Sequence, residues 1–282
     1  MKSLHDLDSS IDRWFMEDIG EGDHTTFSTI PPNALSSAKL LVKETGILAG
    51  FKVAERIFKR FDPEIKIYPL MEDGAAIEPG DLVFRVSGKV HTILQCERLV
   101  LNIMQRMSGI ATTTRAYVSL VEGTGAKILD TRKTTPGMRY LEKEAVRLGG
   151  GVNHRFGLYD MIMIKDNHID FAGGIEKAIS GTLAYLKEKN LDLDLVVEAR
   201  SLADIEAVLS MGGVRRILLD NFSVEMTGEA VKLVDGRVET ESSGGITRKT
   251  IRSYAECGVD YISVGALTHQ ISSLDLSLKA DF

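Results

Sequence analysis

Hydrophobic and polar residues alternate differently in the first third of the chain and in the remainder. The first part mixes short apolar runs with helical periodicity, and its strands are expected at 36–48, 65–70 and 81–86. A helix with one apolar face is expected at 50–61, and a longer one at 90–107, where Ser108 and Gly109 are expected to end it. These patterns predict a mixed α/β domain over residues 1–108.

After Gly109, short apolar runs alternate regularly with helical segments. Strands are expected at 127–130, 161–164, 193–198, 215–220, 237–241 and 261–264. Helices are expected between most of them, for example at 201–211, 224–234 and 247–257. Such alternation is typical of a parallel sheet or an α/β barrel.

Polar residues follow nearly every one of these six runs, which favours a barrel. In a barrel the chemistry is built on the loops after the strands, whereas an open doubly wound sheet gathers it at one crevice. Because six runs are fewer than eight, we predict an incomplete TIM-like α/β barrel over residues 109–269. The tail at 270–282 alternates Leu274, Leu276 and Leu278 with polar residues, which predicts a strand that returns to the N-terminal domain.

Composition adds little about the fold but restricts the function. The chain has 282 residues and a formal net charge of −6, which argues against a general nucleic-acid binder. Its two cysteines are too few for a disulfide framework, and the N-terminus resembles no secretory signal. A cytoplasmic, soluble protein is therefore expected. Against the acidic background, 127–165 holds eight basic and four acidic residues, which predicts a local anion site.

The basic residues of this segment are the strongest functional indication. They follow the first two barrel strands and are expected to converge at the barrel mouth, where the carboxyl ends of the strands lie. They are Arg132, Lys133, Arg155 and Lys165, with His154 beside them. Arginine suits carboxylates and phosphates because its planar fork makes two parallel hydrogen bonds. The alternative is that nearby acids neutralise the cluster; the candidates are Asp130, Asp160 and Asp166. Arg139, Lys143 and Arg147 instead have the spacing of a solvated helix face.

Two acids and two glycine-containing loops follow the later strands. Glu198 and Asp220 each close an apolar run, where a carboxylate can hold magnesium or stabilise a developing cation; the alternative is a salt bridge to Arg200 or Arg216. The segments 242–246 and 263–269 follow the last two runs, a frequent place for phosphate in barrels. On the 90–107 helix, the polar stripe Arg98, Asn102 and Gln105 is by itself more typical of a solvated face.

Several segments together resemble one enzyme family. They are EDIGEGDHTT, ERLVLNIMQRMSGIATTT, the block from DTRKTTPG to KDNH, VVEAR, LLDN, ESSGGI and VDYISVGALTH. These segments resemble the quinolinate phosphoribosyltransferases. The resemblance implies an N-terminal α/β sandwich domain, an incomplete barrel, and a homodimer whose active sites borrow residues from the neighbour. It also implies transfer of phosphoribosyl from phosphoribosyl pyrophosphate to quinolinate with Mg²⁺, giving nicotinate mononucleotide, pyrophosphate and CO₂ for NAD synthesis.

The same resemblance implies roles for individual residues. The quinolinate pocket matches Arg132, His154, Arg155 and Lys165, and Arg98 matches the arginine that a partner subunit supplies. Lys133 matches a lysine near the pyrophosphate and ribose, and Glu198 and Asp220 match the acids near the ribose and magnesium. The 5′-phosphate site matches Ser243, Gly244, Gly245, Gly265 and His269. The residues with catalytic roles are Lys133, Lys165, Glu198 and Asp220.

Three alternatives stay open from the sequence. One is the related protein of molybdenum-uptake operons, and another is a nicotinate phosphoribosyltransferase. A dicarboxylate accounts better than nicotinate for three cations, Arg132, Arg155 and Lys165. The third is a non-catalytic sensor of a phosphorylated ligand, which would not need Glu198 and Asp220 to stabilise a cationic transition state.

Overall fold

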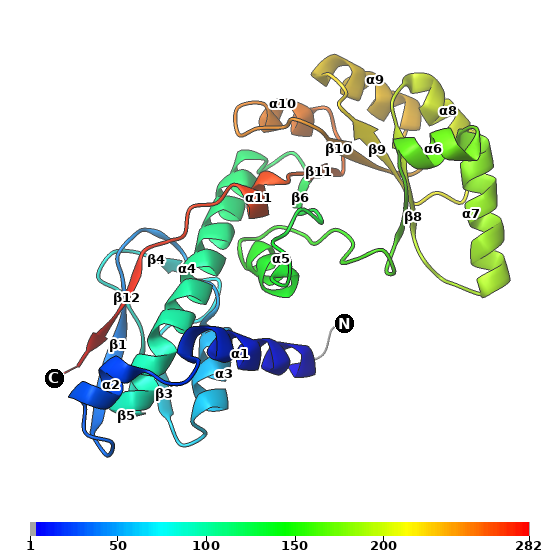
Figure 1. Ribbon diagram of the computed structural model, residues 1–282. Helices are drawn as coiled ribbons and strands as arrows, with labels where there is room; N and C mark the ends of the chain where they lie inside the picture. Colours follow the sequence, from blue (N-terminus) through cyan, green and yellow to red (C-terminus); the bar gives the residue numbers. More distant parts are fainter. Residues whose placement is uncertain (1–3, 282) are drawn as a thin grey trace. The chain divides into compact units, whose positions relative to one another are not determined.

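The N-terminal unit of the structure, a computed structural model that describes residues 4–281, is built on an antiparallel sheet. The unit combines the chain up to Thr113 with Tyr140–Gly150 and the segment from Gln270 onward. Its four-stranded sheet has the order β12-β1-β5-β3, with bounds Leu276–Ala280, Leu35–Val42, Leu82–Lys89 and Lys66–Pro69. A second, two-stranded sheet pairs β2 with β4, bounds Gly46–Ile47 and Ala76–Ile77. The unit also contains helices α1 (Leu4–Ile19), α2 (His24–Thr29) and α3 (Phe51–Phe61) (Figure 1).

The C-terminal strand β12 is held in this sheet by its buried leucines. Leu276 pairs with Val42 and Leu278 with Leu40, in antiparallel register with β1. All four of these side chains are buried, so alternate residues of β12 face the core while the others face outward, as the period of a strand requires.

Helix α4 is longer than predicted. It runs from Val90 to Leu120 without ending at Ser108 and Gly109. Ser108 is buried, and its hydroxyl contacts the backbone of Ala49 as both donor and acceptor. Gly109 lies against Ser272, where a Cβ would overlap the Ser272 carbonyl oxygen. The two residues therefore serve close packing inside a helix, and the prediction that they end it was wrong.

Helix α5 (Arg139–Leu148) also departs from prediction. Its residues from Tyr140 onward belong to the N-terminal unit, although the predicted barrel domain spans 109–269. Glu142 is buried and accepts from Arg106 of α4 at 2.6 Å. Lys143 is only 2% exposed, so the interpretation of this segment as a solvated face was wrong for Lys143. It holds for Arg147, which is exposed and pairs with Glu144.

The second unit, Thr114–Arg139 with Gly151–His269, contains a parallel six-stranded sheet. The strands are β6 (Lys127–Leu129), β7 (Ile162–Ile164), β8 (Leu195–Ala199), β9 (Arg216–Asp220), β10 (Glu239–Ser243) and β11 (Tyr261–Ser263). Their order is β6-β11-β10-β9-β8-β7, and every pair is parallel. Within the described residues the edge strands β6 and β7 do not pair with each other, and a single bridge joins Leu129 to Val152. The predicted class, an incomplete α/β barrel, is confirmed.

Helices follow most of these strands. They are α6 (Asp166–Ala172), α7 (Ile175–Lys189), α8 (Leu202–Met211), α9 (Val224–Val234), α10 (Ile251–Glu256) and α11 (Ala266–His269). Figure 1 shows α6, α7, α8 and α9 along one side of the sheet. Helix α10 begins four residues later than the expected start at 247, because 247–250 form a turn closed by Thr247 and Thr250. No helix within residues 4–281 is long and apolar enough to cross a membrane.

Register places the interior side chains at distinct levels. Glu198, Leu218 and Glu241 are paired across β8, β9 and β10, so their side chains point to the same face of the sheet. Asp220 and Ser243 are paired two residues further toward the carboxyl ends of their strands. Because side chains return to one face every second residue, this second pair lies above the first at the barrel mouth.

A substitution of Gly109 tests the close packing inside α4. Gly109→Ala should lower the free energy of unfolding by about 1–3 kcal/mol, because the added methyl group meets backbone atoms of Ser272. Gly181→Ala is the control, since Gly181 lies within α7 with open space at its Cβ position and should be neutral or slightly stabilising. Urea unfolding measures both, and equal effects of the two substitutions would contradict the packing argument.

Candidate active site

Arg155 is a buried cation at the centre of the candidate site. It is only 9% exposed, and its guanidinium donates to the carbonyl oxygen of Met161 at 3.2 Å. Burial lowers the pKa of Arg155, and the nearby charge of Arg132 lowers it further, while Asp160 acts in the opposite direction. Arg132 itself is exposed. Two of the predicted cations are therefore neighbours, and the charge of Arg132 disfavours that of Arg155.

The three acids that might have neutralised the cluster bind backbone N–H groups. Asp130 Oδ1 accepts from the N–H of His154 at 2.8 Å. Asp160 accepts from two successive N–H groups, those of Phe156 and Gly157, at 2.6 and 2.7 Å. Asp166 accepts from the next N–H in its own helix. In these contacts the acids meet backbone N–H groups and shape the loops that carry the cations, while the charge of Asp160 also favours that of Arg155.

Lys165 is the exception, because it pairs with Glu198. The distance from Lys165 Nζ to Glu198 Oε2 is 3.1 Å, and the second oxygen of Glu198 accepts from the Asp166 N–H at 3.3 Å. Glu198 is 4% exposed, whereas Lys165 is exposed. The expected alternative partners are engaged elsewhere, Arg200 with Asp170 and Arg216 with Glu239 and Glu241. The ends of β7 and β8 are therefore joined by an ion pair at the mouth.

Asp220 ends β9 beside the first glycine loop. Its carboxylate is half-buried and accepts from the side-chain amide of Asn221 at 2.8 Å. Asn221 has a positive φ of 56° and donates its N–H to the carbonyl of Ser243 at 2.9 Å. A Cβ on Gly244, where φ is 96°, would overlap the Asn221 amide. Glycine is therefore required at 244 both by backbone conformation and by space.

The second glycine loop lies against Lys133. A Cβ on Gly265 would come within 2.9 Å of His269 Nε2 and 3.2 Å of Lys133 Cδ. Thr268 Oγ1 donates to the Lys133 carbonyl at 2.9 Å. Ser243 and Gly244 thus lie against Asp220 and Asn221, while Gly265 lies against both His269 and Lys133. Gly245 is exposed with a φ of 61°, and Arg98 is exposed on α4 in the N-terminal unit.

The described residues offer Mg²⁺ carboxylate ligands but not a complete ligand set. Within the described part of the chain, no group of three or more His, Cys, Asp or Glu side chains is arranged to hold a metal ion. Glu198 and Asp220 are oxygen donors on adjacent strands, which fits a Mg²⁺ that takes one or two carboxylates and completes its shell with water and substrate phosphates. Of the two, Asp220 carries no ion pair within the described residues, whereas Glu198 already pairs with Lys165.

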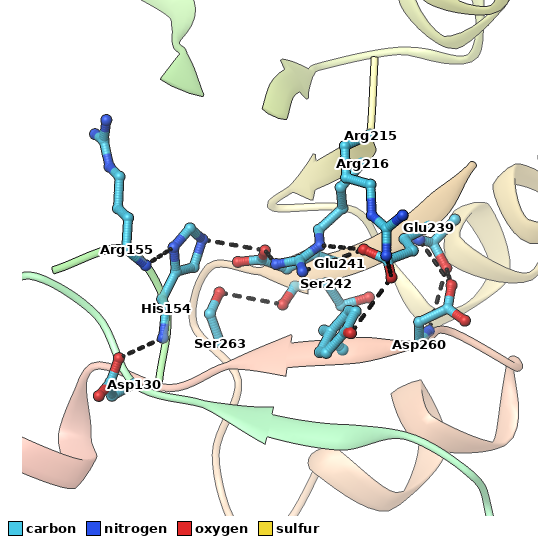
Figure 2. Close-up of polar contacts among 12 residues, drawn as sticks. Asp130, His154, Arg155, Arg215, Arg216, Glu239, Glu241, Ser242, Asp260 and Ser263 are labelled. Carbon is cyan, nitrogen blue, oxygen red and sulfur yellow. Dashed lines mark hydrogen bonds and ion pairs between the residues drawn. The ribbon is translucent and has the colours of Figure 1, made fainter. Parts of the chain in front are cut away.

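Sequence reasoning missed a group of charged residues inside the barrel (Figure 2). Glu241 is fully buried, and its Oε2 lies 3.0 Å from Arg216 and 3.2 Å from His154 Nε2. Arg216 also pairs with Glu239 and stacks on the Tyr261 ring, with its guanidinium carbon 3.9 Å from the ring centre. Burial acts to raise the pKa of Glu241, but the contacts with His154 and Arg216 outweigh it, so the pKa lies below its ordinary value.

An incomplete parallel barrel with cations, two acids and two glycine loops at its mouth defines a class of α/β barrel enzymes that act on anionic, phosphate-bearing substrates. Two family models divide the chain between them. The N-terminal domain of quinolinate phosphoribosyl transferase matches residues 23–108, and the C-terminal domain matches residues 110–279. The chain therefore belongs to the quinolinate phosphoribosyltransferase family.

Individual relatives agree with these matches. Quinolinate phosphoribosyltransferase [decarboxylating] 1b of Nicotiana tabacum is 45% identical over 98% of this chain and 83% of its own length. A probable nicotinate-nucleotide pyrophosphorylase [carboxylating] of Bacillus subtilis is 40% identical over 96% of this chain and 92% of its own. The crystal structure of NadC from Streptococcus pyogenes superposes with a TM-score of 0.93 at 39% identity, covering 100% of this chain and 99% of that one.

The buried pair of Glu241 and Arg216 predicts a specific loss of stability in acid. A carboxyl with a lowered folded pKa contributes stability above its unfolded pKa of about 4.3, and that contribution is lost as the pH falls through the folded value. Glu241→Gln should therefore cost about 3 kcal/mol at pH 7 and progressively less below about pH 4. Urea unfolding at pH 7, 5, 4 and 3 measures this difference.

Glu188→Gln is the matched control for this experiment, because Glu188 forms an exposed pair with Lys189. It should cost under about 1 kcal/mol at every pH. A difference between wild type and Glu241→Gln that stays constant from pH 7 to pH 3 would contradict the assignment of a lowered pKa to Glu241.

Proposed function

We propose a residue-level mechanism for this chain, which is a decarboxylating quinolinate phosphoribosyltransferase of NAD biosynthesis. The observation that carries it is the buried guanidinium of Arg155, which lies beside Arg132 and donates to a neutral carbonyl. Buried charge of one sign is unfavourable unless an opposite charge compensates it. A ligand with two carboxylates supplies that compensation.

Quinolinate binds through the cations at the ends of β6 and β7. Arg132 and Arg155 take the carboxylates, because a guanidinium binds a carboxylate through two parallel hydrogen bonds. Lys165 contributes a third positive charge, which it shares with Glu198 at 3.1 Å. His154 completes this wall of the pocket through the loop that it shares with Arg155. Arg98 comes from the neighbouring subunit of a homodimer.

Phosphoribosyl pyrophosphate binds on the opposite strands. The 5′-phosphate lies on the two glycine loops, contacted by Ser243, Gly244, Gly245, Gly265 and His269. The absence of Cβ atoms in these loops lets backbone N–H groups approach a phosphate closely. Lys133 faces the pyrophosphate and ribose from the end of β6. Magnesium bound to the pyrophosphate and held by Asp220 and Glu198 would neutralise part of its charge.

The reaction follows from these positions. As the bond from the ribose carbon to pyrophosphate breaks, that carbon becomes cationic, and the carboxylates of Glu198 and Asp220 stabilise it electrostatically. The pyridine nitrogen of quinolinate attacks the carbon and becomes positively charged. The ring then accepts the electron pair of the adjacent carbon–carboxylate bond, and CO₂ leaves. Protonation of that ring carbon gives nicotinate mononucleotide. No side chain needs to act as a nucleophile.

The alternatives differ in what they require of the site. The human nicotinic acid phosphoribosyltransferase structure is 12% identical with a TM-score of 0.62, which shows a shared fold alone. A non-catalytic sensor would not need carboxylates at the ends of both β8 and β9. Cytoplasmic placement stays a prediction, since plant relatives include one named chloroplastic and one named mitochondrial.

One assay tests the proposed function. The purified protein is incubated with phosphoribosyl pyrophosphate, Mg²⁺ and quinolinate labelled in the carboxylate next to the ring nitrogen. Release of labelled CO₂ together with nicotinate mononucleotide is expected, with no turnover when nicotinate replaces quinolinate or when EDTA removes the metal. Turnover of nicotinate, or binding without CO₂ release, would support one of the alternatives instead.

Arg155 provides the most direct test of the quinolinate pocket. Arg155→Ala should raise the KM for quinolinate about 10- to 100-fold, the size expected for losing hydrogen bonds to a charged group. The KM for phosphoribosyl pyrophosphate should change little. Arg147→Ala is the control, because Arg147 is exposed and pairs only with Glu144 among the described residues. Unchanged kinetics in Arg155→Ala would remove Arg155 from the pocket.

The shared active site of the proposed homodimer can be tested by mixing two inactive variants. If Arg98 and Arg155 act in one site from different subunits, a heterodimer of Arg98→Ala with Arg155→Ala retains one intact site. Random exchange at equal amounts should then restore about a quarter of wild-type activity in a symmetric dimer. Activity that stays at the level of the separate variants, with exchange confirmed by mass spectrometry, would place both arginines in one subunit's site or outside it.

A further inference from the structure

A chain of charged contacts runs from the interior of the barrel to the loop that carries Arg155. Arg216, on β9, lies 3.0 Å from Glu241 of β10, and Glu241 lies 3.2 Å from His154 Nε2. All three residues are buried. In Figure 2 the His154 ring lies between the Glu241 carboxylate and the backbone nitrogen of Arg155. The chain of contacts therefore ends at the backbone of a proposed quinolinate-binding residue.

Both nitrogens of the His154 ring face protein groups. The backbone N–H of Arg155 donates to Nδ1 at 2.7 Å, which requires that Nδ1 carry no proton. The ring proton then lies on Nε2, which faces Glu241 Oε2. A ring held in this way offers neither nitrogen to a ligand. This arrangement indicates a different role for His154, which the family resemblance placed among the substrate-binding residues.

The same contacts fix the backbone from which the Arg155 side chain extends. The His154 N–H donates to Asp130 Oδ1 at 2.8 Å, and Asp130 is fully buried. The Arg155 N–H is fixed by the ring of His154, and Figure 2 shows its guanidinium pointing away from Glu241. The guanidinium donates to the carbonyl of Met161. Rotation of the His154 ring would therefore release one of the contacts that orient Arg155.

We infer that Glu241, held by Arg216, is a positioning residue: it fixes the proton of His154 on Nε2 and, through His154, orients Arg155 toward quinolinate. The inference rests on the proposed role of Arg155. Glu241 itself contacts neither substrate. Both contacts are made by one oxygen of Glu241, Oε2, and a neutral amide oxygen in that place would hold them more weakly than a charged carboxylate does.

The substitution Glu241→Gln uses this difference. In that variant the amide oxygen can take the place of Oε2 and face both Arg216 and His154 Nε2, but without the negative charge that strengthens the two contacts. The ring of His154 is then held less firmly against the N–H of Arg155. The expected result is a rise of about tenfold or more in the KM for quinolinate. The KM for phosphoribosyl pyrophosphate should change by less than about threefold, because the ring does not touch the glycine loops.

Glu239→Gln is the matched control. Glu239 lies on the same strand and the same interior face, and it also pairs with Arg216, but its hydrogen bonds and ion pairs within the described residues do not include His154. Both KM values should stay within about threefold of wild type in this variant. Equal rises for both substrates in Glu241→Gln, or equal effects of Glu239→Gln and Glu241→Gln, would mean a general structural role and overturn the inference.

The proton on the ring can be observed without measuring activity. Protein labelled with ¹⁵N-histidine should show a His154 ring with its proton on Nε2 and a bare Nδ1 in two-bond ¹H–¹⁵N spectra, with His154→Gln assigning the signal. In Glu241→Gln the signal of the Nε2 proton should shift, because the group that faces it loses its negative charge. A wild-type ring with its proton on Nδ1 overturns the inference even if the Glu241→Gln variant does not fold.

These measurements separate the inference from the proposed function. If Arg155→Ala leaves the KM for quinolinate unchanged, the proposed role of Arg155 is wrong, and the positioning of a quinolinate ligand by Glu241 is wrong with it. If Arg155→Ala raises that KM while Glu241→Gln does not, the pocket stands and the positioning role of Glu241 is wrong.

Discussion

The register of the six parallel strands is the constraint on which the site depends. A shift of one residue between two strands turns every side chain of one strand to the opposite face. Glu198 and Glu241 reach the interior because both pair with Leu218 across β9, and Asp220 reaches the mouth opposite Ser243. These strands are buried almost throughout, so apolar contacts on both faces fix the register. The loops after the strands carry further reactive side chains, and the strand register has already fixed where these loops begin.

Much of this architecture could be predicted from local patterns. Each of the six expected barrel strands corresponds to an observed strand, because short apolar runs bounded by helical segments leave few alternatives. The features that could not be predicted depend on neighbours distant in sequence. Helix α4 continues through Gly109 because Ser272 packs against it, and Lys143 is buried although its spacing is that of a solvated face. The residues near positions 109 and 143 in the sequence do not indicate what packs against either position.

The candidate site shows the same division between local and distant information. Arg132 and Arg155 were expected together, and the charge of Arg132 does lower the pKa of Arg155. The ion pair of Lys165 with Glu198 was not expected, because residues 33 positions apart give no signal of contact. Glu241 was interpreted only as the last residue of the expected strand 237–241 and as part of the segment ESSGGI. Its alternation with Glu239 did indicate two carboxylates on one strand face, but only the register with β9 brings Arg216 to them.

The barrel contains two layers of charged residues, one in its interior and one at its mouth. The two layers differ in how far the protein itself pairs their charges, and this difference accounts for how the proposed site can bind a dianion. Inside, Arg216 is matched by Glu239 and Glu241, so the buried carboxylate of Glu241 already has a cationic partner. An unsaturated Glu241 would be the natural partner for a buried guanidinium, because pairing would relieve the cost of burying both charges. Glu241 already lies beside Arg216 and His154, so Arg155 is not required to balance its charge. The charge of Arg155 therefore stays available at the mouth of the barrel. In the proposed mechanism, a ligand with two carboxylates then completes the charge balance around Arg155.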